Sequence, residues 1–197
     1  MINNNNYKGI KRIHRNKNMS NMEFFNYLIN KLGYTDLEIC HNYYIKNQKM
    51  FSKWVKFIDL LQYEPEEYIK SLHAKRDEFI NKATHRSVLD IEIMIDIDEA
   101  GNHKSIKEKA KDICKRLIKD NIAFTCSFSG SKSYHISILV PELRNKSKTF
   151  VYNFKNKILS NCFSSDAMKS SCRNMIALEG VSHWKTGKIK KEVLSYE

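Results

Sequence analysis

The sequence predicts an α+β fold in its C-terminal part, built in the order strand, helix, strand, strand, helix, strand. Two changes in the spacing of apolar residues support this order. Over 89–98, isoleucine and leucine alternate with mostly acidic residues, which is the period of a half-buried strand. Over 106–117, apolar residues recur every three or four positions, which is the period of an amphipathic helix. We therefore expect a βαββαβ-type sheet with helices on one face and the other face open for a ligand.

Local signals bound the remaining elements. Gly101 ends the first strand, and Ser105 with Glu108 forms a capping box at which the helix begins. A short run of Ser and Gly residues indicates a hairpin loop between the second and third strands. The later elements are expected as strands over 123–129, 134–140, 174–178 and 188–194, and as a helix over 147–160.

The N-terminal part of the sequence shows no residues with an evident chemical role. Residues 1–19 are polar and basic and are expected to form a flexible arm. Residues 20–85 are interpreted as a mostly helical accessory segment, because apolar residues over 50–62 recur at helical spacing and Pro65 is typical of a helix start. Residues 86–197 are expected to form the sheet domain.

The net charge of +12 arises from 34 Lys and Arg against 22 Asp and Glu. An excess of this size favours a polyanionic partner, although a lysine-rich protein from an AT-rich genome would show it too. No stretch approaches the roughly 18 to 20 apolar residues of a membrane span, and the N-terminus lacks the apolar core of a signal peptide. We expect no membrane partner and an intracellular location, in the cytoplasm or nucleoid, or in the nucleus of a eukaryote.

Five cysteines are present, and none lies in a Cys-x-x-Cys pair. A zinc ribbon is therefore not predicted. Cys162, Cys172 and His183 match no strong metal-binding spacing, so free thiols in a reducing compartment are the expectation.

Alternation places Asp90, Glu92, Asp96 and Asp98 on one side of the first strand. A half-buried strand needs a polar face, and this is the simpler explanation. However, Asp and Glu are poor strand formers, and neighbouring carboxylates repel each other. Asp96 and Asp98 lie two residues apart, which separates them by about 6 to 7 Å along the strand backbone. From these positions their side chains can converge on two divalent ions that lie roughly 3.5 to 4 Å from each other. Hard oxygen ligands favour Mg²⁺ or Mn²⁺.

A small polar loop with one cation precedes the third strand. Ser129, Gly130 and Ser133 allow backbone N–H groups to approach phosphate oxygens, and Lys132 supplies positive charge. If the isoleucines of the third strand form core, His135 points to the open face with the aspartates. The alternative is an ordinary hairpin turn with a surface histidine.

Three segments in this order resemble motifs of the archaeo-eukaryotic primase superfamily. They are MIDID (94–98), SGSKSYHISI (129–138) and GVSHWKTGKI (180–189). The resemblance spans about half of the chain and implies a ferredoxin/RRM-like palm over 86–197. It further implies a DNA primase or primase-polymerase, an enzyme that synthesises primers in DNA replication by two-metal, template-directed nucleotidyl transfer.

The resemblance also implies residue roles. Asp96 and Asp98 would bind the catalytic metals, and His135, helped by Lys132 within the Ser129–Ser133 loop, would contact the nucleotide triphosphate. His183, with Lys185, would contact nucleotide phosphates as well.

Two family positions differ in this sequence. The third metal-binding carboxylate is expected shortly before the last motif, where Ser170 and Ser171 stand. Asp166 is the first candidate for this ligand and Glu179 the second. A basic residue is common six positions before the last motif's histidine, and here that position is Ala177.

The expected partners are a single-stranded DNA template and nucleoside triphosphates, with a large primase subunit or a helicase as candidate protein partners. The main alternative is a catalytically weak or inactive primase-like palm that binds nucleic acid or nucleotide within a larger replication complex. A rolling-circle initiator is not favoured, because no two histidines are separated by a single residue. A basic domain that binds RNA by charge alone leaves the three motifs unexplained.

Overall fold

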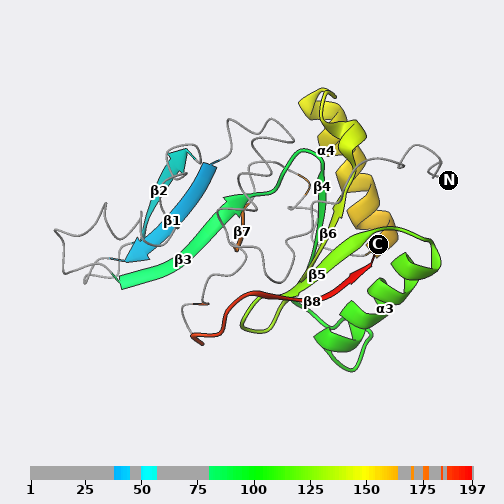
Figure 1. The fold of residues 1–197 in the computed structure, drawn as a ribbon, viewed down its shortest axis with the longest axis horizontal. Helices are drawn as coiled ribbons and strands as arrows, with labels where there is room; N and C mark the ends of the chain where they lie inside the picture. Colours follow the sequence, from blue (N-terminus) through cyan, green and yellow to red (C-terminus); the bar gives the residue numbers. More distant parts are fainter. Residues whose placement is uncertain are drawn as a thin grey trace.

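A computed structural model describes the backbone of residues 38–44, 50–56, 80–163, 170, 175–177, 183 and 186–196. Side chains are described within 88–163 and at 170, 176, 177, 183 and 186–196. Over these residues the chain has an α+β fold with two four-stranded antiparallel sheets (Figure 1). This confirms the predicted fold class.

The palm sheet, as we call the second sheet, has the strand order β4-β6-β5-β8. Its strands are β4 (Glu92–Ile97), β5 (Phe124–Phe128), β6 (Tyr134–Leu139) and β8 (Lys191–Tyr196). Because β4 and β5 are both antiparallel to β6, they run in the same direction with β6 between them. The helix α3 (Ile106–Lys119) connects them, which gives the predicted split βαβ topology. The last strand, β8, pairs with β5 at the edge opposite β4.

Both helices of the palm begin directly after a serine that caps them, and the cap at Ser105 was predicted. The Oγ of Ser105 accepts a hydrogen bond from the N–H of Glu108 at 3.1 Å at the start of α3. The Oγ of Ser147 accepts one from the N–H of Phe150 at 3.3 Å at the start of α4 (Lys148–Ile158). A 3-10 turn, Pro141–Leu143, precedes α4, and a π-helical turn, Leu159–Phe163, follows it.

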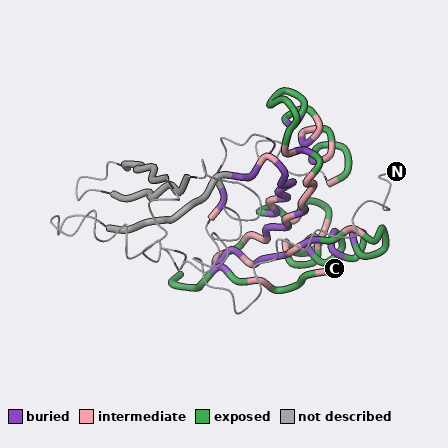
Figure 2. The backbone as a smooth tube through the Cα atoms, turned by 45° about the horizontal axis from the view of Figure 1, so that its top comes forward, coloured by how far each residue is buried: buried purple, intermediate pink, exposed green. Residues whose placement is uncertain are grey.

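The hydrophobic core lies between the palm sheet and the two helices. Ile95 of β4 lies opposite Ile136 of β6, which lies opposite Cys126 of β5, and all three pack against α3. Burial of each large aliphatic side chain contributes about 1.5 to 3 kcal/mol to the free energy of unfolding. Figure 2 shows buried residues along the palm strands and exposed residues on the outer surfaces of the helices. The alternating isoleucines thus determine which face the helices cover.

The first sheet lies where helix was expected. Its order is β2-β1-β3-β7, and its strands are β1 (Glu38–Tyr44), β2 (Met50–Lys56), β3 (Ile80–Ser87) and β7 (Met175–Ala177). The prediction of a mostly helical segment over 20–85 is therefore wrong for the described residues of that range. Short runs rich in aromatic and β-branched residues suit a strand as well as a helix, and only long-range pairing distinguishes them. The remainder of that range, and the expected arm 1–19, lie outside the described residues.

The two strands predicted near the C-terminus are both present, but they belong to different sheets. β7 pairs with β3 through three residue pairs, including His85 with Ala177. β8 instead completes the palm sheet. The expected boundary between residues 85 and 86 falls inside β3.

β7 also covers part of the palm face that was expected to be open. Met94 of β4 points away from the helices, and it is buried against Val88 and Ile176 of β7. The Nζ of Lys190 donates a hydrogen bond of 2.6 Å to the carbonyl oxygen of Ala177, which ties the start of β8 to β7. The face is therefore covered at Met94, and the polar residues beyond it lie nearer the end of β4.

None of the helices in the described part of the chain has the length and apolar character needed to cross a bilayer.

Candidate functional site

A row of polar residues crosses the palm sheet on the face opposite the helices. Asp96 of β4 lies opposite His135 of β6, His135 opposite Ser127 of β5, and Ser127 opposite Glu192 of β8. Directly opposite residues on antiparallel strands have Cβ atoms about 4.5 to 5.5 Å apart. The alternation that buries the isoleucines on one face therefore gathers Asp96, His135 and Ser127 on the other. Glu192 lies opposite Ser127 just after a register shift in the pairing of β5 with β8.

Within this row, the side chains of Asp96 and His135 are in contact. The Nε2 of His135 lies 3.6 Å from Oδ1 of Asp96, and the two side chains are 8% and 18% exposed. This placement agrees with the expectation that His135 faces the aspartates. At this distance, longer than a hydrogen bond, the two groups attract each other when the imidazole is protonated.

Asp98 follows β4 directly and is exposed. With Asp96 it supplies two carboxylates, and these hard oxygen donors suit Mg²⁺ or Mn²⁺. Within the described residues, no group of three or more His, Cys, Asp or Glu side chains is arranged to hold a metal ion. The expected third ligand, Asp166, and its alternative, Glu179, lie outside the described residues.

The other two acidic residues of the segment have structural roles. Glu92 is 2% exposed, and its carboxylate accepts hydrogen bonds from Ser137 Oγ at 2.6 Å and from the N–H of Leu89 at 3.2 Å. Asp90 lies in the turn before β4 and pairs with Arg144 at 3.1 Å. The simpler interpretation, a polar strand face, therefore suits these two positions.

The Ser-Gly turn, residues 129–133, is held together from within. The N–H of Ser129 donates to the carbonyl oxygen of Ser133 at 2.9 Å. In return, Ser129 Oγ accepts the N–H of Ser133 at 3.1 Å and that of Ser131 at 3.4 Å. Ser129 is buried, whereas the side chain of Lys132 is exposed. Ser129 thus shapes the turn, and Lys132 is its charged group in contact with solvent.

The His183 turn, of which residues 183 and 186–188 are described, packs onto the Ser-Gly turn. The N–H of His183 donates to the carbonyl oxygen of Lys188 at 2.8 Å, and the N–H of Gly187 donates to the carbonyl oxygen of His183 at 2.8 Å. Gly130 has φ +89°, and a Cβ placed on it would lie 2.4 Å from the Lys188 oxygen and 3.0 Å from His183 Cβ. The backbones of the two turns are therefore in direct contact.

The structure brings most of the predicted site residues to one end of the palm sheet. Asp96 and His135 are in contact, and His183 lies against Gly130. Lys185 lies outside the described residues. Two further residues of this region were not predicted from the sequence. Alternation along the two hairpin strands could have placed Ser127 beside His135. Thr186 had no signal except its position between Lys185 and Gly187.

Comparison with known proteins adds one structural likeness. No protein-family model matches the chain, and no curated protein matches it. The structure is similar to a crystal structure of the primase RepB', with a TM-score of 0.48 and 11% sequence identity over 88% of this chain and 56% of that one. The chain thus spans little more than half the length of that protein. At this score and identity the likeness assigns no function to this chain.

Proposed function

We propose that this protein catalyses template-directed nucleotidyl transfer as a DNA primase or primase-polymerase. The observation that carries the proposal is the convergence of three segments distant in the sequence. Residues 94–98 and 129–138 meet through the Asp96–His135 contact, and the described residues of the third segment, 183 and 186–189, join them where His183 packs against Gly130. Asp96, His135 and the Ser-Gly turn therefore lie at the same end of the palm sheet, which supports a site for metal and phosphate there.

The residues of this site suit the binding of a nucleoside triphosphate. Asp96 and Asp98 would hold Mg²⁺ or Mn²⁺, which when bound activates the attacking hydroxyl and neutralises phosphate charge. His135, which lies beside Asp96, would donate a hydrogen bond to a phosphate oxygen. Lys132 and His183 would add positive charge and N–H donors around the same phosphates. Catalysis of phosphoryl transfer rests mainly on such positioning and electrostatic stabilisation.

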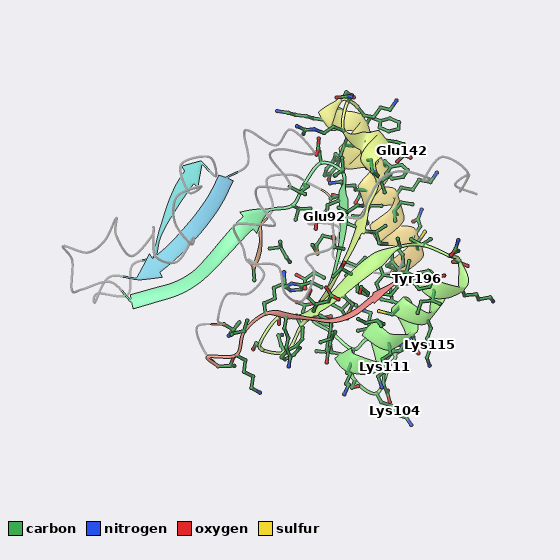
Figure 3. All side chains as sticks on the ribbon, viewed as in Figure 1. Glu92, Lys104, Lys111, Lys115, Glu142 and Tyr196 are labelled. Carbon is green, nitrogen blue, oxygen red and sulfur yellow. The ribbon has the colours of Figure 1, made fainter. Side chains whose placement is uncertain are left out.

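The excess of positive charge supports a nucleic-acid partner, which lysines on the helix side of the palm sheet, away from the site, would contact. Exposed lysines follow one flank of α3 at positions 107, 111 and 115, and Lys104 precedes the helix. Figure 3 shows Lys104, Lys111 and Lys115 extending outward from this part of the fold. Lysines that neutralise phosphates release counterions, which favours binding to DNA at low salt. A large primase subunit or a helicase would supply further template contacts.

The test is nucleotide incorporation on a single-stranded DNA template with Mg²⁺ or Mn²⁺, each with and without a primer. Wild type is compared with a double variant that carries both Asp96→Ala and Asp98→Ala. The control is Asp112→Ala, which removes an exposed carboxylate on α3. Product from wild type and from the control, lost in the double variant, would support the proposal. If wild type binds DNA but makes no product under either metal, the protein is instead a binding palm within a larger replication complex.

A further inference from the structure

The hydroxyl group of Thr186 joins the two turns of the site. Its Oγ1 donates a hydrogen bond of 2.5 Å to the carbonyl oxygen of Gly130, 56 positions away in the sequence. The same oxygen accepts the N–H of Lys188 at 3.3 Å. One side chain thus bridges the Ser-Gly turn and the backbone of the His183 turn.

Gly130 provides independent evidence that this contact is close. Its positive φ of +89° is a conformation that side chains with a Cβ rarely adopt. A Cβ at this position would also lie 2.4 Å from the carbonyl oxygen of Lys188. The turn that contains Thr186 therefore rests directly on the backbone of Gly130, and the hydroxyl group of Thr186 fixes that contact at one point.

Thr186 contributes little to the hydrophobic core. The residue is exposed, whereas the core cluster of the palm consists of residues on β4, β5, β6 and the helices. β8 is held separately, by pairing with β5 and by the hydrogen bond from Lys190 to Ala177. Loss of the Thr186 hydroxyl should therefore change the position of the turn without unfolding the palm.

We propose that Thr186 is a positioning residue that sets His183 and Lys188 against the Ser-Gly turn, so that both turns form one binding surface for the triphosphate of a nucleotide. This inference rests on the proposed function. Lys188 and Lys132 are both exposed, one on each turn, and His183 is half-buried against Gly130. Bound phosphates would be contacted from both turns, and the affinity would depend on their relative position.

The inference predicts different effects for two substitutions. Thr186→Val keeps the shape of the side chain but removes the hydroxyl, which leaves the carbonyl oxygen of the buried Gly130 without this donor. We expect nucleotide binding to weaken roughly five- to thirtyfold. The KM for nucleotide should rise by a similar factor while kcat changes little, because the group acts on binding. Thr186→Ser keeps the hydroxyl and should bind within about twofold of wild type.

Binding of a nucleoside triphosphate with Mg²⁺ is measured for wild type, both Thr186 variants and Thr149→Val, a control at an exposed threonine on α4. Melting temperatures are recorded for each. We expect only Thr186→Val to bind the nucleotide weakly, and we expect its melting temperature to stay close to that of wild type. Equal affinities of Thr186→Val and wild type would overturn the inference and leave the proposed function intact, whereas a wild type that binds no nucleotide would overturn both.

A double-mutant cycle with Gly130→Ala gives a second test. A Cβ at Gly130 should itself displace the His183 turn, so Thr186→Val should weaken binding little further in that background. If the two substitutions lower the affinity by independent factors that multiply, Thr186 does not act through Gly130 and the inference is overturned.

Discussion

The Nε2 atom of His135 lies 3.6 Å from Oδ1 of Asp96, across the pairing of β6 with β4. Both side chains are largely buried, and electrostatic interactions are stronger there than in water. The contact links the acidic segment to the segment that follows the Ser-Gly turn. It also lies on the face of the palm sheet that the helices leave uncovered.

The first prediction concerns His135 itself. We expect His135→Ala to lower the rate of nucleotide incorporation about 100-fold or more, because a positioned donor to phosphate would be lost. The rate is measured on a primed single-stranded DNA template at saturating nucleotide. His103→Ala is the matched control, since His103 pairs with the exposed Asp112 on α3. Equal rates in the two variants would remove His135 from the proposed site.

A second prediction separates close packing from backbone conformation. Gly130 and Gly187 both have positive φ, but a Cβ on Gly187 would meet no atom within 4 Å. Gly187→Ala should therefore lower the free energy of unfolding by only about 1 to 2 kcal/mol. Gly130→Ala carries the same conformational cost and must also displace the Lys188 carbonyl, so its loss should be larger.

Chemical or thermal unfolding of the two glycine variants measures this difference. If Gly130→Ala were no less stable than Gly187→Ala, the His183 turn would not rest against Gly130 as described.

A third prediction follows from the thiols in the core. The hydrogen bond with Cys114, together with burial, raises the pKa of Cys126 well above that of an ordinary thiol. Cys126 therefore stays protonated at pH values where a free thiol, with a pKa of about 8.5, ionises. Because the thiolate is the reactive form, iodoacetamide should label the exposed Cys162 but not Cys126 in the folded protein.

Mass spectrometry of labelled peptides tests this at pH 8 and at pH 9.5. Labelling of Cys126 should stay low at both values and appear only after denaturation. Rapid labelling of Cys126 at pH 9.5 in folded protein would contradict the raised pKa. The unfolded chain releases this thiol proton above about pH 8.5 whereas the folded chain keeps it, so this group also makes the free energy of unfolding fall as pH rises.

Local signals predicted much of the palm from the sequence. The capping box at Ser105 and the alternation along β4 each depend on residues close together in the chain, and both appear in the structure as expected. Alternation along β4 and along β6 also predicts that Asp96 and His135 share one face of the sheet, and the strand pairing confirms this.

The first sheet and the contact between the two turns of the site were not predicted. β1 and β2 are strands because they pair with each other and with β3, and β3 in turn pairs with β7 more than 80 positions later. Their aromatic residues suit either helix or strand, so periodicity could not decide between them. The hydrogen bond from Thr186 to Gly130 likewise joins segments 56 positions apart, and no local pattern records it.

The fourth prediction concerns a buried lysine that fixes the entry to β4. Lys155 of α4 is fully buried, and its Nζ donates a hydrogen bond of 2.5 Å to the carbonyl oxygen of Leu89. The same carbonyl accepts the N–H of Glu92, so Lys155 anchors the turn from which the acidic strand begins. Lys155→Met, which keeps the length of the side chain, should lower the free energy of unfolding by about 1 to 3 kcal/mol.

Lys157→Met is the matched control, because Lys157 is exposed on the same helix. Its free energy of unfolding should stay within about 0.5 kcal/mol of wild type. Urea denaturation of the two variants compares them directly. A Lys155→Met protein as stable as wild type would mean that apolar packing of the stem, and not the hydrogen bond to Leu89, holds α4 against the start of β4.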